Sequence, residues 1–172
     1  FKTMRCRMLV AHISLQCWSA EGVGYSQYWW FSTGGQNGST SADRTSYIPP
    51  NVTRLVVPNE TFANFSRYDE KIITYGHSNL RTEGGDTVWL IGTNFGPVLR
   101  GNVVGATYRN EELSMLAGST FNASGCEVIK DHSVIRCRTS AGVGHAQRWR
   151  PIVGEQTGVR SSNTTSYYPP LI

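Results

Sequence analysis

Charged side chains are scarce in this chain of 172 residues: Asp, Glu, Lys and Arg together make up 16%, and three residues are lysine. No apolar run approaches the roughly 18 residues that a membrane-spanning helix requires. The four cysteines lack the short Cys-x-x-Cys type of spacing, and the matching histidine pair, of structural zinc sites. No glycine-rich segment leads into a predicted helix. These absences argue against a membrane span in this segment, a zinc module and a phosphate-binding loop.

Small polar and aromatic residues are abundant instead. Ser and Thr account for 33 residues and Gly for 18, while aromatic residues make up 11% of the chain. The hydrophobic share of 39% is enough for packed cores. This balance is typical of an all-β extracellular module rather than of a helical cytosolic protein.

The sequence repeats itself with a period of 120 residues. Residues 1–52 align with residues 121–172 without a gap and with 18 identities, most of them Cys, Gly, Pro, aromatic or turn-forming residues. TSYIPP at 45–50 thus matches TSYYPP at 165–170. A repeat of this length predicts compact domains. We therefore interpret residues 1–50 as the C-terminal part of one repeat and residues 51–172 as a complete repeat.

The Pro-Pro pairs at 49–50 and 169–170 are expected to form stiff junctions between repeats, because consecutive prolines cannot continue a central strand. The chain begins at Phe1 without an initiator Met or a leader, which indicates a segment of a longer polypeptide. The half unit lacks its opening strands. They are expected from the upstream chain, and strand exchange with another copy is the alternative.

The cysteines form two pairs with equal spacing, Cys6 with Cys17 and Cys126 with Cys137. Equal spacing in both repeats predicts one disulfide per unit, each contributing about 2–3 kcal/mol on the chain-entropy model. Four buried free thiols are the alternative interpretation.

Asn-x-Ser/Thr sequences, the acceptor sites of N-linked glycans, are the second extracellular signal. They occur six times although the chain has ten Asn, more often than chance explains in a Ser- and Thr-rich sequence. The predicted sites are Asn37, Asn51, Asn59, Asn64, Asn122 and Asn163. A secreted or cell-surface glycoprotein of a eukaryote is therefore expected.

Short β-type runs separated by turn-forming residues predict an antiparallel β-sandwich of immunoglobulin type. One short helical turn is expected at 111–117. Strands are predicted at 52–57, 71–75, 87–91, 103–108, 126–129, 133–138, 147–153 and 164–168.

Residues 82–97, TEGGDTVWLIGTNFGP, resemble the opening signature of an IPT/TIG domain. The segment from Cys126 to Gly144 resembles the Cys…Cys…Gly-x-Gly part of that family, and residues 1–50 resemble the end of the same domain. The resemblance implies an immunoglobulin-like sandwich, either in extracellular tandem modules or in DNA-binding transcription factors. Residues 59–80 depart from the family by being longer and more polar, which suggests a glycan-bearing excursion.

Nucleic-acid binding and catalysis are poorly supported. The net charge of +4 and pI near 9.0 suit a phosphate backbone, but the arginines are dispersed, and glycan sites and paired cysteines do not suit a nucleus. His12 and His132 occupy the same repeat position, and nothing in the sequence around them proposes a catalytic partner, so we predict structural histidines. No enzymatic activity, cofactor or metal is expected.

One set of positions that differs between the two repeats alternates with predicted core residues, so these positions are expected to face outward. Exposed aromatic residues in a row usually mark a contact surface. Coverage of Trp18 and Trp30 by a neighbouring domain or loop is the alternative. The predicted contact stripe comprises Trp18, Tyr28 and Trp30 in the first unit and Arg136, Arg138, Arg148 and Arg150 in the second.

Taken together, these features predict a structural subunit of a glycosylated extracellular fibre or surface rod built from tandem IPT-like domains. Its expected partners are copies of itself and glycans, and nucleic acid is not among them. The alternative is a cell-surface adhesion or carbohydrate-binding module, in which the aromatic residues stack on sugar rings.

Overall fold

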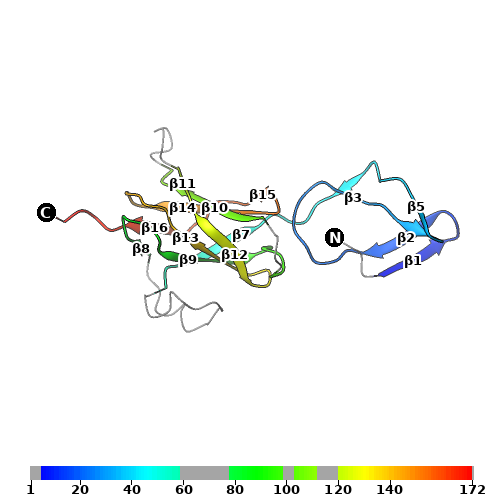
Figure 1. Ribbon diagram of the computed structural model, residues 1–172, viewed down its shortest axis with the longest axis horizontal. Coiled ribbons are helices and arrows are strands. Elements are labelled where there is room, and N and C mark those ends of the chain that lie inside the picture. Colours follow the sequence, from blue (N-terminus) through cyan, green and yellow to red (C-terminus); the bar gives the residue numbers. More distant parts are fainter. Residues whose placement is uncertain (1–4, 59–77, 99–102, 112–119, 172) are drawn as a thin grey trace.

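The computed structural model describes residues 5–58, 78–98, 103–111 and 120–171. Strands make up the regular structure of these residues, and none of them forms a helix long and apolar enough to cross a membrane. The molecule is elongated, with a sandwich formed by the second unit and a more open N-terminal part beside it (Figure 1). The predicted strand at 71–75 and almost all of the predicted helical turn at 111–117 lie outside the described residues.

Two facing sheets form the sandwich of the second unit. The four-stranded sheet is antiparallel and has the order β12-β13-β9-β7. Its strands are β7 (Asn51–Val56), β9 (Thr87–Thr93), β12 (Ser124–Lys130) and β13 (Val134–Arg138). The other sheet has the order β11-β10-β14-β16-β8, with β15 paired to β14. Its strands are β8 (Asn79–Leu80), β10 (Val104–Arg109), β11 (Thr120–Asn122), β14 (Gln147–Val153), β15 (Gln156–Thr157) and β16 (Thr164–Tyr167).

Residue alternation explains how each strand is buried. In β14, every second residue is buried, with Trp149 at the centre, so one face of the strand meets the core. Most of β9 is buried on both faces. Val88 and Leu90 point into the main core, whereas Trp89 packs in a second cluster on the other side of the sheet.

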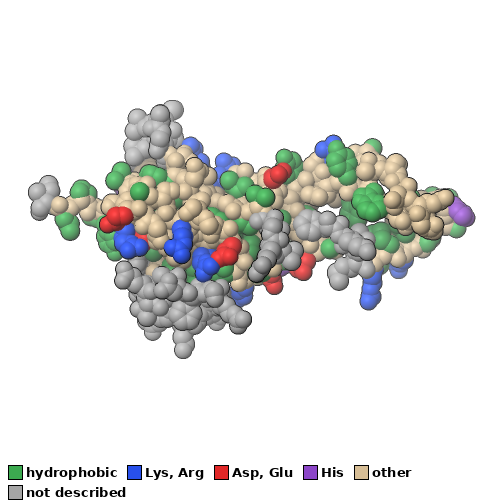
Figure 2. All heavy atoms as spheres, viewed as in Figure 1, with side chains coloured by type: hydrophobic (Ala, Val, Ile, Leu, Met, Phe, Trp, Pro, Cys, Tyr) green, Lys and Arg blue, Asp and Glu red, His purple; other side chains and the backbone are tan. Residues whose placement is uncertain are grey.

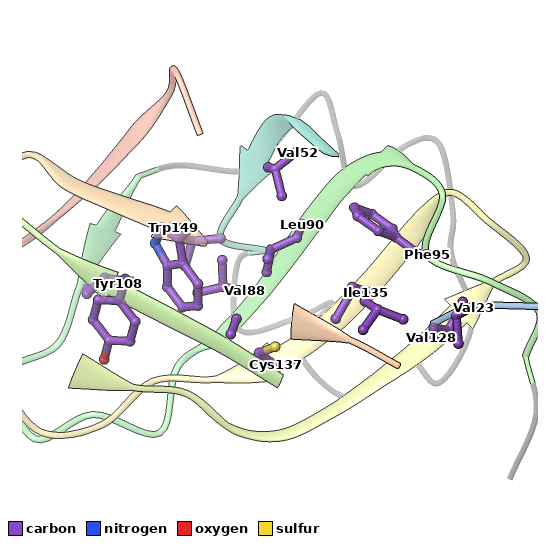
Figure 3. Packing of buried hydrophobic residues seen from close by; sticks show 14 of the residues in the cluster. Val23, Val52, Val88, Leu90, Phe95, Tyr108, Val128, Ile135, Cys137 and Trp149 are labelled. Carbon is purple, nitrogen blue, oxygen red and sulfur yellow. The ribbon is translucent and has the colours of Figure 1, made fainter. Parts of the chain in front are cut away.

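Aromatic stacking organises the main core (Figure 3). The rings of Tyr108 and Trp149 are stacked with centroids 4.2 Å apart, and Phe121 stacks on the other side of Tyr108 at 5.3 Å. The hydroxyl groups of Tyr108 and Tyr167 lie 2.8 Å apart. Burial, and then the hydrogen bond with Tyr108, raises the pKa of Tyr167 above its ordinary value. The phenol therefore remains a neutral hydrogen-bonding group within the core.

The N-terminal unit consists of three antiparallel strand pairs. They are β1 (Arg5–Val10) with β2 (Ser14–Trp18), β3 (Gln27–Tyr28) with β6 (Arg44–Thr45), and β4 (Ser32–Thr33) with β5 (Gln36–Asn37). Hydrophobic side chains remain on its surface (Figure 2). Leu15 of β2 is 43% exposed, whereas Ile135, its equivalent in the second unit, is fully buried. Facing strands like β9 and β10 are absent from the described part of this unit.

The same local contacts occur in both units. A disulfide joins the two strands of each hairpin, Cys6–Cys17 in one and Cys126–Cys137 in the other. The indole nitrogen of Trp29 donates a hydrogen bond to Thr45 Oγ1 at 2.8 Å, and that of Trp149 donates to Thr165 Oγ1 at 2.9 Å. The disulfide-linked hairpin and the indole hydrogen bond therefore have the same local geometry in both units.

The prediction of an all-β sandwich with antiparallel sheets is confirmed for the described residues, with one exception, because β8 pairs with β16 in parallel. The observed strands match seven of the eight predicted runs within a few residues, and the remaining run, 71–75, lies outside the described residues. The sequence did not predict β8, β11 or β15. Strands of two or three residues are too short to show an alternating pattern, so tertiary pairing defines them.

Candidate functional site

The aromatic residues of the predicted contact stripe are exposed on the N-terminal unit. Trp18 is 50% exposed, Tyr28 53% and Trp30 62%. The guanidinium carbon of Arg7 lies 5.6 Å from the ring centroid of Trp18, and that of Arg44 lies 4.1 Å from the ring of Tyr28. Arginines of the same unit thus already make cation–π contacts with two of the three rings.

The four arginines of the stripe lie on different sheets. Arg136 and Arg138 belong to β13 of the four-stranded sheet, and Arg148 and Arg150 belong to β14 of the other sheet. The residue between the members of each pair is fully buried, so both pairs point away from the core. Because the two sheets face each other, the pairs lie on opposite sides of the sandwich. They form two separate surfaces rather than one row.

Each arginine pair has contacts within its own domain. Arg136 forms an ion pair with Glu127, which lies across from it on β12. Arg150 donates a hydrogen bond from Nε to the carbonyl oxygen of Gly158 at 3.0 Å. These contacts hold the arginine side chains against the sheets. Fewer of their N–H groups therefore remain available to bind a neighbouring molecule.

A positively charged cluster lies at Glu111, where β10 ends and β14 begins. One carboxylate oxygen lies 3.2 Å from Nε of Arg160, and the other lies 3.6 Å from Nε of Arg148. Arg109 is the direct cross-strand partner of Arg148. Burial, followed by the charge of Arg109, lowers the pKa of Arg160. Arg148 and Arg160 contact this carboxylate and Arg109 lies next to Arg148, so the local charge is positive and favours the approach of an anionic group.

The second histidine of the repeat contacts the preceding unit. His132 Nε2 lies 3.0 Å from Oε2 of Glu21, a carboxylate that is distant in sequence and therefore missed by sequence reasoning. Both side chains are largely exposed, so the pair contributes little to stability. The ion pair is notable for its position, because it connects the N-terminal unit to the second unit.

The main contact between the units is made by residues 22–24, which we call the docking loop. Val23 is 7% exposed and belongs to the main core cluster of the second unit, which also contains Val128 (Figure 3). Its partner is the turn between β14 and β15, residues 153–156, which we call the docking turn. A Cβ atom on Gly154 would lie 2.7 Å from Cγ2 of Val23. The close packing therefore requires glycine at this position.

Gln156 of the docking turn binds two segments of the N-terminal unit. Its side-chain oxygen accepts a hydrogen bond from the amide of Gly24 at 3.1 Å, and its nitrogen donates to the carbonyl oxygen of Tyr47 at 2.8 Å. Gln156 is 9% exposed, so both hydrogen bonds are shielded from water. One amide thereby fixes the docking loop and the segment before the Pro-Pro pair.

The Pro-Pro pair lies against the sandwich as well. The side-chain amide of Asn94 donates to the carbonyl oxygen of Pro49 at 3.2 Å, and Pro50 is buried. Asn51 follows immediately as the first residue of β7. The connection between the units is therefore short and held by contacts on both sides, which restricts bending.

Sequence reasoning did not identify Val23, Gly154 or Gln156 as contact residues. The signal was available, because all three are identical to their equivalents in the other unit, Val143, Gly34 and Gln36. Identity alone does not distinguish a residue that packs within a domain from one that packs between domains.

Four of the predicted glycan sites lie on the surface that the structure describes. Asn37, Asn51, Asn122 and Asn163 are exposed, whereas Asn59 and Asn64 lie outside the described residues. Exposure of the asparagine is the geometric requirement for an N-linked glycan.

No three His, Cys, Asp or Glu side chains among the described residues lie close enough together to hold a metal ion. No family of known proteins matches the chain, and no characterised protein or solved structure is significantly similar to it.

Proposed function

We propose that this chain is a structural segment of a glycosylated extracellular fibre or surface rod, built from tandem sandwiches of the IPT/TIG kind. The observation that carries the proposal is the junction between the units. Val23 is buried against Gly154, and Gln156 hydrogen-bonds to both Gly24 and Tyr47. Fixed contacts between successive units suit a protein that maintains an extended shape.

The chemistry of the surface agrees with an extracellular location. The two disulfides are of the type that persists in oxidising compartments. Four exposed asparagines in glycan-acceptor sequences favour a glycosylated surface. The proposed role is mechanical and requires neither a cofactor nor a catalytic group.

Electron microscopy of the native material, combined with intact-glycopeptide mass spectrometry, tests this role. Extended rods or fibres carrying glycans at Asn37, Asn51, Asn122 and Asn163 are expected. Compact, unglycosylated monomers would contradict the proposal. Removing the glycans enzymatically before imaging serves as a control, because rods held together by protein contacts should keep their length.

Carbohydrate binding is the second candidate, favoured by the exposed indole rings of Trp18 and Trp30. The apolar face of a sugar packs on aromatic rings of this kind. Binding to a glycan array should then be lost in Trp18→Ala and Trp30→Ala. Ile48→Ala is a suitable control, because Ile48 is an exposed apolar residue of the same unit. Equal binding by all three variants and the original chain would argue against this role.

A further inference from the structure

The C-terminal unit carries a second copy of the docking loop, residues 142–144. Val143 is 71% exposed there, whereas its equivalent Val23 is 7% exposed at the junction. Gly144 is exposed as well, whereas Gly24 is buried. The same apolar side chain is therefore buried at one end of the second unit and accessible at the other.

This second docking loop already has the conformation of the first. Gly24 and Gly144 have φ values of 106° and 103°. The amide of Tyr167 donates to the carbonyl oxygen of Gly144 at 2.9 Å, and that of Tyr47 donates to Gly24 at 3.0 Å. Since the loop is held in place without a partner, little conformational freedom would be lost on binding.

The N-terminal unit carries a second copy of the docking turn, residues 33–36. Gly34 has φ 55°, close to the 54° of Gly154, but a Cβ atom on Gly34 would meet nothing within 4 Å. Gln36 is exposed, in contrast to the buried Gln156. Met8 is equivalent to Val128, which belongs to the same core cluster as Val23, and Met8 is 61% exposed. The second docking turn thus has space beside Gly34 for a valine side chain. It also carries the amide of Gln36, which is free to form hydrogen bonds.

We propose that the docking loop 142–144 of one copy of this chain binds the docking turn 33–36 of a second copy. Val143 packs against Gly34 and Met8 of that copy. Gln36 accepts a hydrogen bond from the amide of Gly144 and donates one to the carbonyl oxygen of Tyr167. The occupant follows from continuity with the junction already present, which joins the same loop to the same turn. This inference rests on the proposed role in a fibre and supplies its longitudinal contact.

Such an interface joins two different surfaces, so it is heterologous and does not close on itself as a twofold dimer does. Strand β5, which begins with Gln36, lies at the end of the long axis opposite the C-terminus (Figure 1). Copies joined through these surfaces form a linear array along that axis. The interface between copies lacks the histidine–glutamate pair, because the residue before the second docking loop is Ala141, whereas Glu21 precedes the first.

Sedimentation velocity of the chain over a range of concentrations tests the proposal. The original chain should form a ladder of species that grows with concentration. Val143→Arg should raise the apparent dissociation constant at least about tenfold, because the larger charged side chain cannot pack against Gly34. Val159→Arg is the matched control, since Val159 is 69% exposed and lies outside both docking surfaces. It should assemble as the original chain does.

Cysteine variants test the pairing directly. Val143→Cys places a thiol on the docking loop, and Gly35→Cys places one on the docking turn. Gly35 is equivalent to Glu155, a non-glycine residue with a similar backbone conformation, so a side chain is tolerated there. A short thiol-reactive cross-linker should join the two variants when they are mixed. It should give far less product when either variant is treated alone.

The outcomes separate this inference from the proposed function. Cross-links between unlike variants, together with weakened assembly of Val143→Arg alone, support the proposed interface. Assembly that is unaffected by Val143→Arg, or cross-links that form equally within one variant, overturns the interface while the fibre role stands. A chain that stays monomeric at every concentration overturns the second copy as the occupant. Rods in the native material would then still support the fibre role.

Discussion

Trp29 and Trp149 make the same hydrogen bond through the indole nitrogen, yet Trp149 is fully buried and Trp29 is only partly buried. The difference comes from the strands around them. Trp149 lies between two sheets and stacks on Tyr108, whereas the N-terminal unit has no facing sheet among its described residues. The two hydrogen bonds have the same geometry but differ in burial. Comparing variants of the two sites therefore measures the effect of burial on the free energy of unfolding.

Replacing the threonine that accepts each indole hydrogen bond should reveal this difference. Thr165→Val leaves the buried indole nitrogen of Trp149 without its acceptor, which should lower the free energy of unfolding of the second unit by about 1–3 kcal/mol. Thr45→Val should cost less than about 1 kcal/mol, because water reaches Trp29 and can replace the lost acceptor. Denaturant titrations followed by tryptophan fluorescence measure both values. Equal losses would mean that burial in the folded state does not determine the cost.

The two glycines of the docking turns provide a second matched pair. Ala at either Gly34 or Gly154 must adopt a left-handed backbone, at a cost of about 1–2 kcal/mol. Only Gly154→Ala also places its methyl group 2.7 Å from Val23 and 2.8 Å from the amide nitrogen of Gly24. We expect Gly154→Ala to separate the units, and Gly34→Ala to leave their contact intact.

Small-angle scattering checks this expectation through the distribution of interatomic distances. Gly154→Ala should broaden the distribution and increase the radius of gyration, while Gly34→Ala should match the original chain. An unchanged profile for Gly154→Ala, in a protein that unfolds normally, would show that the packing of Val23 does not hold the units together.

The disulfides should differ in their importance for the second unit. Cys126–Cys137 joins two strands of the sandwich, with a sequence separation of 11. Changing both residues to Ser should destabilise this unit by about 2–3 kcal/mol. The same change at Cys6 and Cys17 should leave the unfolding midpoint of the sandwich nearly unchanged, because their hairpin lies in the other unit. Differential scanning calorimetry under non-reducing conditions distinguishes the two variants.

Local patterns in the sequence predicted most of the strands but not the surfaces between elements. Alternation correctly places Arg136 and Arg148 on the outside of their strands. It does not reveal that β13 and β14 belong to different sheets. For this reason the sequence predicts a single contact stripe for four arginines that lie on two separate surfaces. Sheet membership depends on long-range pairing, which a window of a few residues does not contain.

The same limit applies to the docking surfaces. Val23 and Val143 lie in identical Gly-Val-Gly sequences, yet one is buried and the other is exposed. Their burial is decided by whether a docking turn lies next to them. The repeat in the sequence shows which residues are equivalent. The structure shows which of these equivalent residues contact a docking turn.

The open face of the N-terminal unit leads to the last prediction. In the second unit, β13 pairs with β12 on one side and with β9 on the other, whereas the equivalent strand β2 pairs with β1 alone among the described residues. A peptide with the sequence of residues 84–96, GGDTVWLIGTNFG, contains β9 and should bind along the free edge of β2 by strand addition. Its Val and Leu side chains would cover Leu15, which is 43% exposed.

Added to the intact chain, the peptide should slow proteolysis within residues 5–48 without changing cleavage elsewhere. A peptide carrying Val88→Asp and Leu90→Asp keeps the backbone hydrogen-bonding groups but removes the apolar face, and it should protect poorly. Equal protection by both peptides, or none by either, would show that β2 does not receive a strand of this kind, and the exposed apolar side chains of the unit would then need a different cover.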